Sequence, residues 1–429
     1  MSLPAQSDVA VIGGGIIGAS TALFLARQGV SVTLCEKGRI GGEQSSRNWG
    51  WCRSMGRDAR EIPLAVESLR LWQQMDALTG GQTGFVACGI VNLGASDREL
   101  AAQQTWLEAA RRHQIATREL AAADIAALVP GSPRRWAGAV LTPGDGRAEP
   151  AAATEAIAAA AVRHGATVLT GCAVRGLDTV GGRVAGVITE RGRLAAASVV
   201  LAGGAWSRLL CGNHGLDLPQ LSVLGSVLRT APLSGLPEIS VGGPDFAFRK
   251  RRDGGYTVAR RGASVTDITP DSFRLFGDFA PALIHDWREL RLRLGRRFIT
   301  EWRIPRRFAL DATTPFERMR VLDPAPVGRL LDAGRRNLVR AFPGFADMVV
   351  AETWAGLMDV TPDAVPVIGP AAVLPGLFLA TGFSGHGFGI GPGAGRLMAD
   401  LITGHAPLVD PAPFRLGRFR RSADLVRAG

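Results

Sequence analysis

The sequence contains very little lysine, tyrosine and cysteine for a chain of 429 residues. Of its 49 basic residues only Lys37 and Lys250 are lysine, and Tyr256 is the single tyrosine. The five cysteines form no CxxC pair and have no histidine spacing suited to zinc, so we predict reduced thiols and no metal site. No basic, apolar leader precedes the strand predicted from Asp8, which favours a cytoplasmic protein.

The net charge of +11 comes almost wholly from arginine. These arginines are scattered along the chain, apart from a cluster over 415–421, so we interpret them mainly as solvated surface and expect no nucleic-acid partner. The charge leaves peripheral association with the inner face of a membrane as an open alternative. Hydrophobic residues make up 46% of the chain, which argues against disorder and predicts large buried cores.

The first thirty-six residues carry a complete strand–helix–strand pattern. A short apolar strand is predicted over Asp8–Ile12, a helix over Ala19–Gln28 and a second strand over Ser31–Leu34. The glycine-rich turn Gly13–Gly18 joins the first strand directly to the helix. Strand, turn and helix in this order are typical of a dinucleotide-binding unit.

Individual positions of this unit have separate physical roles. Gly13 allows the tight turn, Gly15 lets the backbone approach a pyrophosphate, and Gly18 permits close packing of helix on strand. Glu36, at the end of the second strand, can accept both hydroxyls of an adenosine ribose. Because a carboxylate there repels a 2′-phosphate, the sequence predicts FAD or NAD rather than NADP.

The remaining pattern alternates between strand-rich and helix-rich stretches. Helical periodicity runs over 98–127, 280–294 and 326–342, and strand-like alternation over 221–259 includes a hairpin with its turn at 253–255. A strand at 374–382 leads into a loop over 383–393 and then a helix. We therefore expect an α/β protein of two discontinuous domains. Residues 1–85, 148–220 and 349–429 are predicted to bind the cofactor, and 86–147 and 221–348 to bind the substrate.

Several motifs together resemble one family. The turn Gly146–Pro150 precedes a helix, Val199–Ser207 is a strand entering a glycine turn, and Thr361–Gly369 precedes the most specific phrase, Gly382–Phe388. With these motifs the chain resembles the D-amino-acid oxidase-like flavoproteins, which include glycine oxidase, sarcosine oxidase and D-amino-acid dehydrogenases. The resemblance implies a Rossmann-type FAD-binding domain with a discontinuous mixed-sheet (α+β) substrate domain. It also implies oxidation of the C–N bond of a D-amino acid, an N-alkyl amino acid or an opine by hydride transfer to flavin N5.

The resemblance also implies which residues hold FAD. They are Ile12, Gly13, Gly15, Ile16, Ile17, Gly18, Glu36, Lys37, Ser45, Ser46, Arg47, Asn48, Val174, Ala202, Gly203, Trp206, Gly382, Phe383, Gly385, His386, Gly387, Phe388 and Gly389. For the residues from Gly382 to Gly389 there is an independent physical argument. A glycine-rich loop that feeds a helix N-terminus presents unpaired N–H groups and a positive dipole end, which suit the negative charge of a reduced flavin.

Three departures from the family pattern refine this expectation. No cysteine stands in 354–360, where relatives with covalent flavin carry one, so we predict non-covalent FAD. Gly389 stands where sarcosine oxidase-like members place a substrate-binding lysine. Only Lys250 could serve as the lysine that promotes reaction with oxygen in some oxidases. We therefore favour a dehydrogenase that passes electrons to a quinone or a carrier protein over an oxidase that uses oxygen.

Arginine is the expected anchor for a substrate carboxylate, because its guanidinium binds carboxylate bidentately. Arg53 is the first candidate because it follows the predicted flavin-edge loop, although a surface or structural ion pair is the competing interpretation. Arg260 and Arg261 are second candidates and could engage a second carboxylate, as an opine carries. Trp49 and Trp51 are predicted to wall the cavity, with core packing as the alternative for one of them.

Two further residues have open interpretations. Tyr256 either contacts the substrate or is a buried strand residue. His386 either hydrogen-bonds the flavin and tunes its potential or holds the shape of its loop, and we do not assign it as a base. Asp359 and Asp363 are expected to satisfy backbone groups near turns. Two alternatives to the main hypothesis are an NAD-dependent oxidoreductase and a polyanion- or membrane-binding protein with a vestigial cofactor domain.

Overall fold

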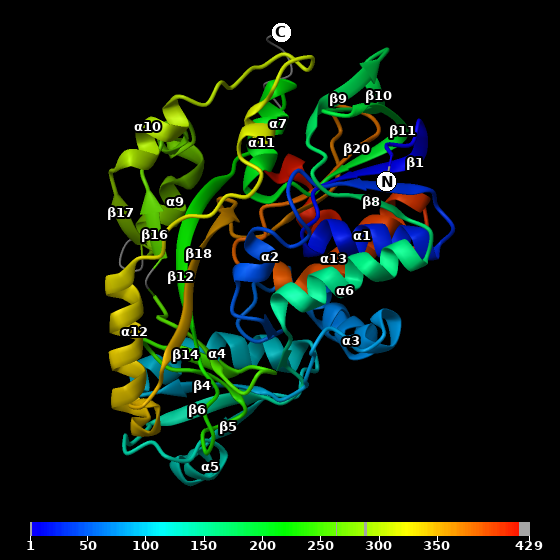
Figure 1. Ribbon diagram of the computed structural model, residues 1–429. Coiled ribbons are helices and arrows are strands. Elements are labelled where there is room, and N and C mark those ends of the chain that lie inside the picture. Colours follow the sequence, from blue (N-terminus) through cyan, green and yellow to red (C-terminus); the bar gives the residue numbers. More distant parts are fainter. Residues whose placement is uncertain (1, 263, 287–289, 420–429) are drawn as a thin grey trace.

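The first sheet is mainly parallel and lies at one end of the molecule (Figure 1). The computed structural model describes residues 2–262, 264–286 and 290–419. The strand order is β19–β20–β11–β1–β2–β8, and the antiparallel pair β9–β10 extends from β11. The bounds are β1 Gln6–Ile12, β2 Val32–Cys35, β8 Thr167–Leu169, β9 Val174–Val180, β10 Arg183–Thr189, β11 Gly192–Leu201, β19 Val367–Pro370 and β20 Leu377–Thr381.

Helices cover one face of this sheet (Figure 1). They are α1 Ile16–Arg27, α3 Ile62–Thr79, α6 Pro150–Arg163 and α13 Gly387–Thr403, while α7 Ser207–Asn213 packs with the core on the other face. The helices approach one another closely because small residues line their contacts. A Cβ at Gly395 of α13 would lie 2.4 Å from the Cβ of Ser20 in α1. None of the helices in the described part of the chain is long and apolar enough to cross a membrane.

The second sheet is mixed and forms the other end of the molecule (Figure 1). Its order is β17–β16–β12–β15–β14–β13–β4–β6–β5, with β18 paired to β12. The strand bounds are β4 Ile90–Gly94, β5 Arg118–Leu120, β6 Gly138–Thr142, β12 Leu221–Thr230, β13 Ser240–Gly242, β14 Ala247–Lys250, β15 Tyr256–Ala259, β16 Ser264–Asp267, β17 Leu290–Arg293 and β18 Val350–Val360. Around it lie α4 Asp97–Arg112, α5 Ala122–Leu128, α8 Pro270–Arg274, α9 Phe276–Asp286, α10 Arg296–Trp302 and α12 Gly328–Ala341. The short α11 Pro315–Arg318 packs instead with α7 against the first sheet.

The two sheets confirm the predicted fold class, a mainly parallel sheet with a second, mixed one. The strands of the first sheet come from residues 6–35, 167–201 and 367–381, so this part of the molecule is discontinuous in sequence. β18 pairs with β12 in the second sheet, although the predicted boundary at residue 349 assigns it to the cofactor-binding part. The exact domain boundaries stay a prediction.

Three predicted elements differ from the structure. The helix expected over 98–127 is interrupted by β5, which pairs with β6. The helix expected over 280–294 ends at Asp286 and is followed by β17, while residues 287–289 lie outside the described residues. The loop expected over 383–393 is shorter, because α13 already begins at Gly387 and accommodates Pro392 within it.

Candidate active site

A cavity of ≈ 680 Å³ begins at the N-terminus of α1. Gly13 has a φ of +108°, and a Cβ there would lie 2.4 Å from the carbonyl oxygen of Ala202. A Cβ at Gly18 would lie 2.0 Å from the carbonyl oxygen of Gly13, so only glycine allows the helix to approach its strand this closely. Gly15 caps α1 without a side chain, and the first turn of the helix contains no acid. The positive end of the helix therefore faces the cavity and suits an anionic group.

Glu36 lies at the carboxyl end of β2 and lines the same cavity. Its Oε2 accepts the Gly14 N–H at 2.7 Å and its Oε1 accepts the Gly38 N–H at 2.7 Å. Burial raises the pKa of Glu36, and these two donors oppose that rise. Each carboxylate oxygen keeps lone-pair capacity beyond its one backbone bond. The arrangement is thus able to accept two hydroxyl groups.

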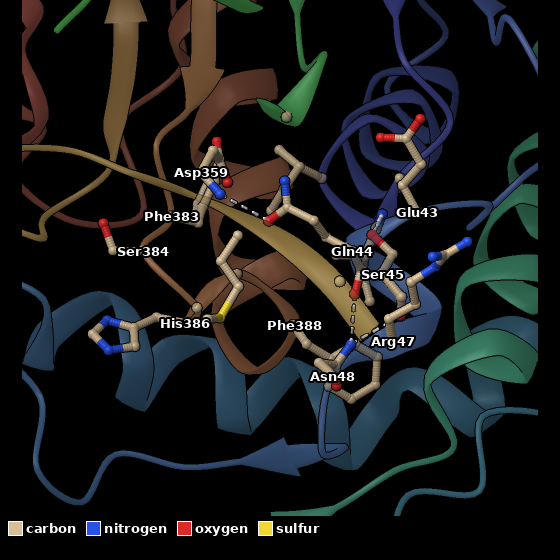
Figure 2. A pocket seen from close by; sticks show the side chains of 18 of the residues that line it. Glu43, Gln44, Ser45, Arg47, Asn48, Asp359, Phe383, Ser384, His386 and Phe388 are labelled. Carbon is tan, nitrogen blue, oxygen red and sulfur yellow. Dashed lines mark hydrogen bonds between the residues drawn. The ribbon is translucent and has the colours of Figure 1, made fainter. Parts of the chain in front are cut away.

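The short helix α2, Gln44–Arg47, forms the next part of the wall (Figure 2). Ser45 Oγ accepts the Ile16 N–H at 2.9 Å and so joins α2 to the start of α1. Asn48 donates to the Ser45 carbonyl at 2.9 Å and accepts the Gly50 N–H at 2.8 Å, which fixes the turn that follows. Polar groups of this segment are therefore held in place along the cavity.

The loop before α13 is anchored by Asp359 at the end of β18 (Figure 2). The Asp359 Oδ2 accepts the Gly382 N–H at 2.6 Å and the Thr381 hydroxyl at 3.0 Å. The Asp359 carbonyl accepts the Ser384 N–H at 2.8 Å. Asp363 likewise accepts the Val365 N–H at 3.3 Å, so both acids satisfy backbone groups near turns as predicted. Burial raises the pKa of Asp359.

Trp49 and Trp51 line the cavity beyond α2, with ring centroids 5.4 Å apart in an edge-to-face arrangement. Their loop is held from behind by Arg249, which donates to the Trp49 carbonyl and pairs with Glu149 at 2.7 Å. The Arg249 side chain is 1% exposed. A buried ion pair between β14 of the second sheet and the N-terminus of α6 thus positions an aromatic wall of the cavity.

Two arginines on one segment line the cavity without an anionic partner. The Arg53 guanidinium donates to the Met55 carbonyl, and Arg57 donates through Nε to the Arg53 carbonyl at 3.4 Å. Within the described residues, neither forms an ion pair with a carboxylate, and Arg57 Nη1 has no hydrogen-bond partner. Burial, reinforced by the charge of Arg53, lowers the pKa of Arg57 to about 9. Burial also lowers the pKa of Arg53.

His386 lines the cavity, but its ring is turned away from Gln44 and Asn48 (Figure 2). Its Nδ1 lies 3.1 Å from Oε2 of Glu61, a residue with no exposed surface that precedes α3. Burial lowers the pKa of His386 to about 4, aided by the charge of Arg57, so the imidazole is neutral near pH 7. A neutral ring that donates from Nδ1 to Glu61 keeps Nε2 as an acceptor. These contacts favour the interpretation in which His386 holds the loop.

The cavity brings together nearly all of the predicted site residues. Of the residues predicted to hold FAD, all but Gly18, Ser46 and Gly382 line it. Gly18 packs under the helix, Ser46 bonds to the Glu43 carbonyl, and Gly382 is held by Asp359. Of the predicted substrate residues, Trp49, Trp51, Arg53 and Arg260 line the same cavity.

The prediction that Tyr256 contacts the substrate is not supported. Tyr256 has no exposed surface, packs its ring against Phe248 and Phe345, and donates its hydroxyl to the Leu236 carbonyl at 3.1 Å. Lys250 covers its ring at 4.6 Å and donates to a carbonyl as well, so this lysine also stays away from the cavity.

Sequence reasoning missed several cavity residues. Gln44 accepts a hydrogen bond from the Asp359 N–H. The Glu43 carboxylate accepts hydrogen bonds from the Lys37 ammonium and from the indole N–H of Trp206. Arg57 also escaped notice, because its segment is neither a helix nor a strand and has no periodicity. Its spacing of four residues from Arg53 was the one hint available.

Comparisons with known proteins agree with this geometry. A family model described as "DAO: FAD dependent oxidoreductase" matches residues 8–401. The chain is 34% identical to the L-amino acid deaminase of Proteus myxofaciens solved with anthranilate, at a TM-score of 0.94 over 98% of this chain and 95% of that one. The L-amino acid deaminase of Proteus vulgaris is 31% identical at a TM-score of 0.93, covering 98% of both chains. The glycine oxidase of Pseudomonas aeruginosa is 28% identical over 411 residues, which are 95% of this chain and 97% of that protein.

The chain therefore belongs to the DAO family of FAD-dependent oxidoreductases. This confirms the resemblance drawn from the motifs and the expectation of FAD as cofactor. The NAD-dependent alternative and the vestigial binding protein give way to this assignment. The residues present also fit FAD, because the glycine cradle of α1 leaves room for a pyrophosphate and Glu36 offers acceptors for ribose hydroxyls.

Proposed function

We propose that this chain is a dehydrogenase with non-covalently bound FAD that oxidises the C–N bond of an amino acid or an N-substituted amino acid. The observation that carries the proposal is the pair of unpaired guanidinium groups, Arg53 and Arg57, in the cavity where the cofactor-binding elements end. A buried cation without a partner is costly, and a substrate carboxylate would remove that cost. Relatives whose names specify amino acids as substrates support the same class.

FAD, when bound, supplies the acceptor for a hydride from the carbon next to nitrogen. The chain's own residues bind, orient and shield the substrate. Arg53 and Arg57 bind its carboxylate, and Trp49 and Trp51 exclude water from the cavity. Asp359 holds the loop that leads into α13, so the positive end of that helix stays directed at the site.

A substrate with a second acidic group is a variant of this proposal. Arg260 also lines the cavity, and its Nε has no partner among the described residues. Arg261 is occupied with Asn92 and the Gly243 carbonyl and contributes no free charge. An opine, which carries two carboxylates, would engage Arg260 together with Arg53 and Arg57.

The dehydrogenase assignment is supported by the commitment of both lysines of the chain to other groups, although Lys37 lines the cavity. Lys37 pairs with Glu43 at 2.6 Å, and Lys250 is committed to the Leu233 carbonyl at 2.7 Å. Neither is free to promote reaction with oxygen. We propose a quinone or a carrier protein as the electron acceptor and a cytoplasmic address, with the inner face of the membrane as the place of transfer.

The test is an absorbance spectrum of the purified protein followed by anaerobic additions of D- and L-amino acids, N-methyl amino acids and opines. Flavin bands that bleach with one class, and that recover faster with a quinone than with air, would support the proposal. Bands that no amino acid bleaches would refute the substrate class. Rapid recovery in air alone would refute the dehydrogenase assignment.

A further inference from the structure

A second cavity, of ≈ 710 Å³, lies behind the strand pair β12–β18. Side chains alternate along β12, so Val223 and Gly225 line the first cavity, whereas Ser222 and Leu224 line the second. Trp206 lines both cavities. The second cavity thus shares a wall with the proposed active site but opens between other elements, α7, α8, β16, β17 and α10.

The charged part of its lining carries more positive than negative charge. Three carboxylates face six arginines, which are Arg208, Arg274, Arg293, Arg296, Arg297 and Arg306. Asp271 alone pairs with three of these arginines, at 3.0, 3.1 and 3.0 Å. Among the described residues Arg296 pairs with no carboxylate. Because the arginines of this wall outnumber its carboxylates, the wall would attract an anionic ligand.

Uncharged polar side chains (Gln220, Ser222, Thr266, Thr269, Ser272 and Thr300) and a larger apolar part make up the rest of the lining. The apolar part comes mainly from β12 and the segment that precedes α12, with Leu357 from β18, and includes Leu221, Leu224, Met319, Leu322 and Val327. Leu224 and Leu357 are at most 6% exposed, whereas Leu221, Met319 and Leu322 are partly exposed and offer apolar surface to a ligand. A small hydrated anion gains nothing from such a surface, whereas an alkyl chain does.

We propose that this cavity is a second ligand site for an amphiphilic organic anion, with a single carboxylate head at the arginines and an apolar body against β12 and β18. The head would pair with Arg296 at the exposed rim, and the body would displace water from the partly exposed Leu221 and Leu322. The site is separate from the substrate site, so the proposal does not depend on the reaction assigned above.

The test is calorimetric titration of the FAD-loaded protein with hexanoate, octanoate and decanoate. Affinity should rise about fourfold per methylene, since each one buried adds a constant apolar area. Acetate and decanol should bind far more weakly than decanoate, because each lacks one half of the recognised chemistry. The same series on the Arg53→Met protein should be unchanged, which separates this site from the first cavity.

Two variants locate the head and the body. Arg296→Ala should weaken decanoate binding by about two- to fivefold, as for a rim charge, whereas Arg303→Ala, an exposed arginine of the same region outside the lining, should not. Thr300→Trp, which fills the cavity from an exposed helical position, should weaken binding at least tenfold. The proposal would be overturned if decanol bound as tightly as decanoate, or if the affinity did not depend on chain length. It would also be overturned if Arg53→Met weakened decanoate binding while Arg296→Ala and Thr300→Trp did not.

Discussion

Replacing Arg57 by methionine should stabilise the protein and impair the enzyme at the same time. The residue is 8% exposed, has no carboxylate partner among the described residues, and has its pKa lowered to about 9, chiefly by burial. Each pKa unit corresponds to about 1.4 kcal/mol, so lowering the pKa from 12.5 to about 9 means that keeping this cation buried costs roughly 5 kcal/mol. The cost is fully present at neutral pH and is relieved only as the pH rises above the folded-state pKa, where the group deprotonates.

Methionine fills a similar volume without charge. It forfeits the 3.4 Å bond to the Arg53 carbonyl and the attraction of Glu61, so we expect a net gain of about 2 kcal/mol in the free energy of unfolding. For a chain of this length that corresponds to a rise in Tm of about 2 °C, since the entropy of unfolding grows with length. Loss of a charge-assisted contact to the substrate should lower kcat/KM for amino acids by about 10- to 100-fold.

The assay combines thermal unfolding at pH 7.5 with anaerobic reduction of the bound flavin over a range of substrate concentrations. Arg60→Met is the matched control, because Arg60 is exposed and pairs with Asp58 and Asp363 at 2.9 Å. It should change neither Tm by more than about 1 °C nor kcat/KM appreciably. A lower Tm for Arg57→Met with unaltered kinetics would show that the guanidinium is a structural partner of Glu61 and would refute the reasoning.

Three further predictions concern the frame of the site. Gly18→Ala should raise the Kd for FAD at least tenfold and destabilise the apoprotein by about 1–3 kcal/mol, because the new Cβ would lie 2.0 Å from a backbone oxygen. Flavin fluorescence measures the Kd and denaturant unfolding measures the stability. Unaltered FAD binding would contradict this prediction. Because the pKa of His386 falls to about 4 on folding, the free energy of unfolding should drop by at most about 3 kcal/mol as the pH falls from 7 to 4. His386→Asn should remove this part of the pH dependence of stability. An identical pH profile for the variant would show that another group titrates. Arg249→Leu should cost about 3–5 kcal/mol, because Glu149 loses its buried partner and keeps only the longer 3.7 Å contact to Arg251. Adding Glu149→Leu should restore most of that stability, and a double variant no more stable than the single one would argue against a buried pair.

Local sequence determined the first unit of the fold almost completely. The predicted strand, turn, helix and second strand agree with β1, α1 and β2 because each is encoded by neighbouring residues: glycine where backbones touch, and apolar runs where both faces are buried. Elsewhere tertiary pairing overrode periodicity. Leu120 lies in a helical pattern, yet β5 is an edge strand because its residues bond to β6. In β17 the alternation Leu290–Arg293 has the period of a strand, but it lies within a longer helical pattern.

Side-chain roles were harder to predict than elements. Glycines and Glu36 could be placed from spacing because the backbone itself forms that part of the cavity. Gln44 and Asp359 meet only because β18 crosses from the second sheet to the loop before α13, a contact between residues 315 positions apart. For Tyr256 the sequence left a substrate contact and a buried strand residue both open, since nothing in a strand pattern tells which face of the sheet meets the cavity, and the structure shows the buried residue.

The arginine excess of this chain is uninformative as a number, because 47 of 49 basic residues are arginine wherever they lie. The role of an arginine is indicated by the groups that surround its guanidinium. On the surface water solvates a guanidinium, and within the fold residues such as Arg175, Arg249 and Arg418 pair with carboxylates at 2.7–2.9 Å. A cavity is different, because there an unpaired arginine is stabilised neither by bulk water nor by an acid. Arg57 comes nearest to that description in the first cavity, because no carboxylate pairs with it and only the longer-range charges of Glu61 and Asp145 attract it. At the exposed rim of the second cavity Arg296 has no carboxylate partner among the described residues. In a chain so rich in arginine, the lack of a carboxylate is therefore better evidence of a ligand than the arginine itself.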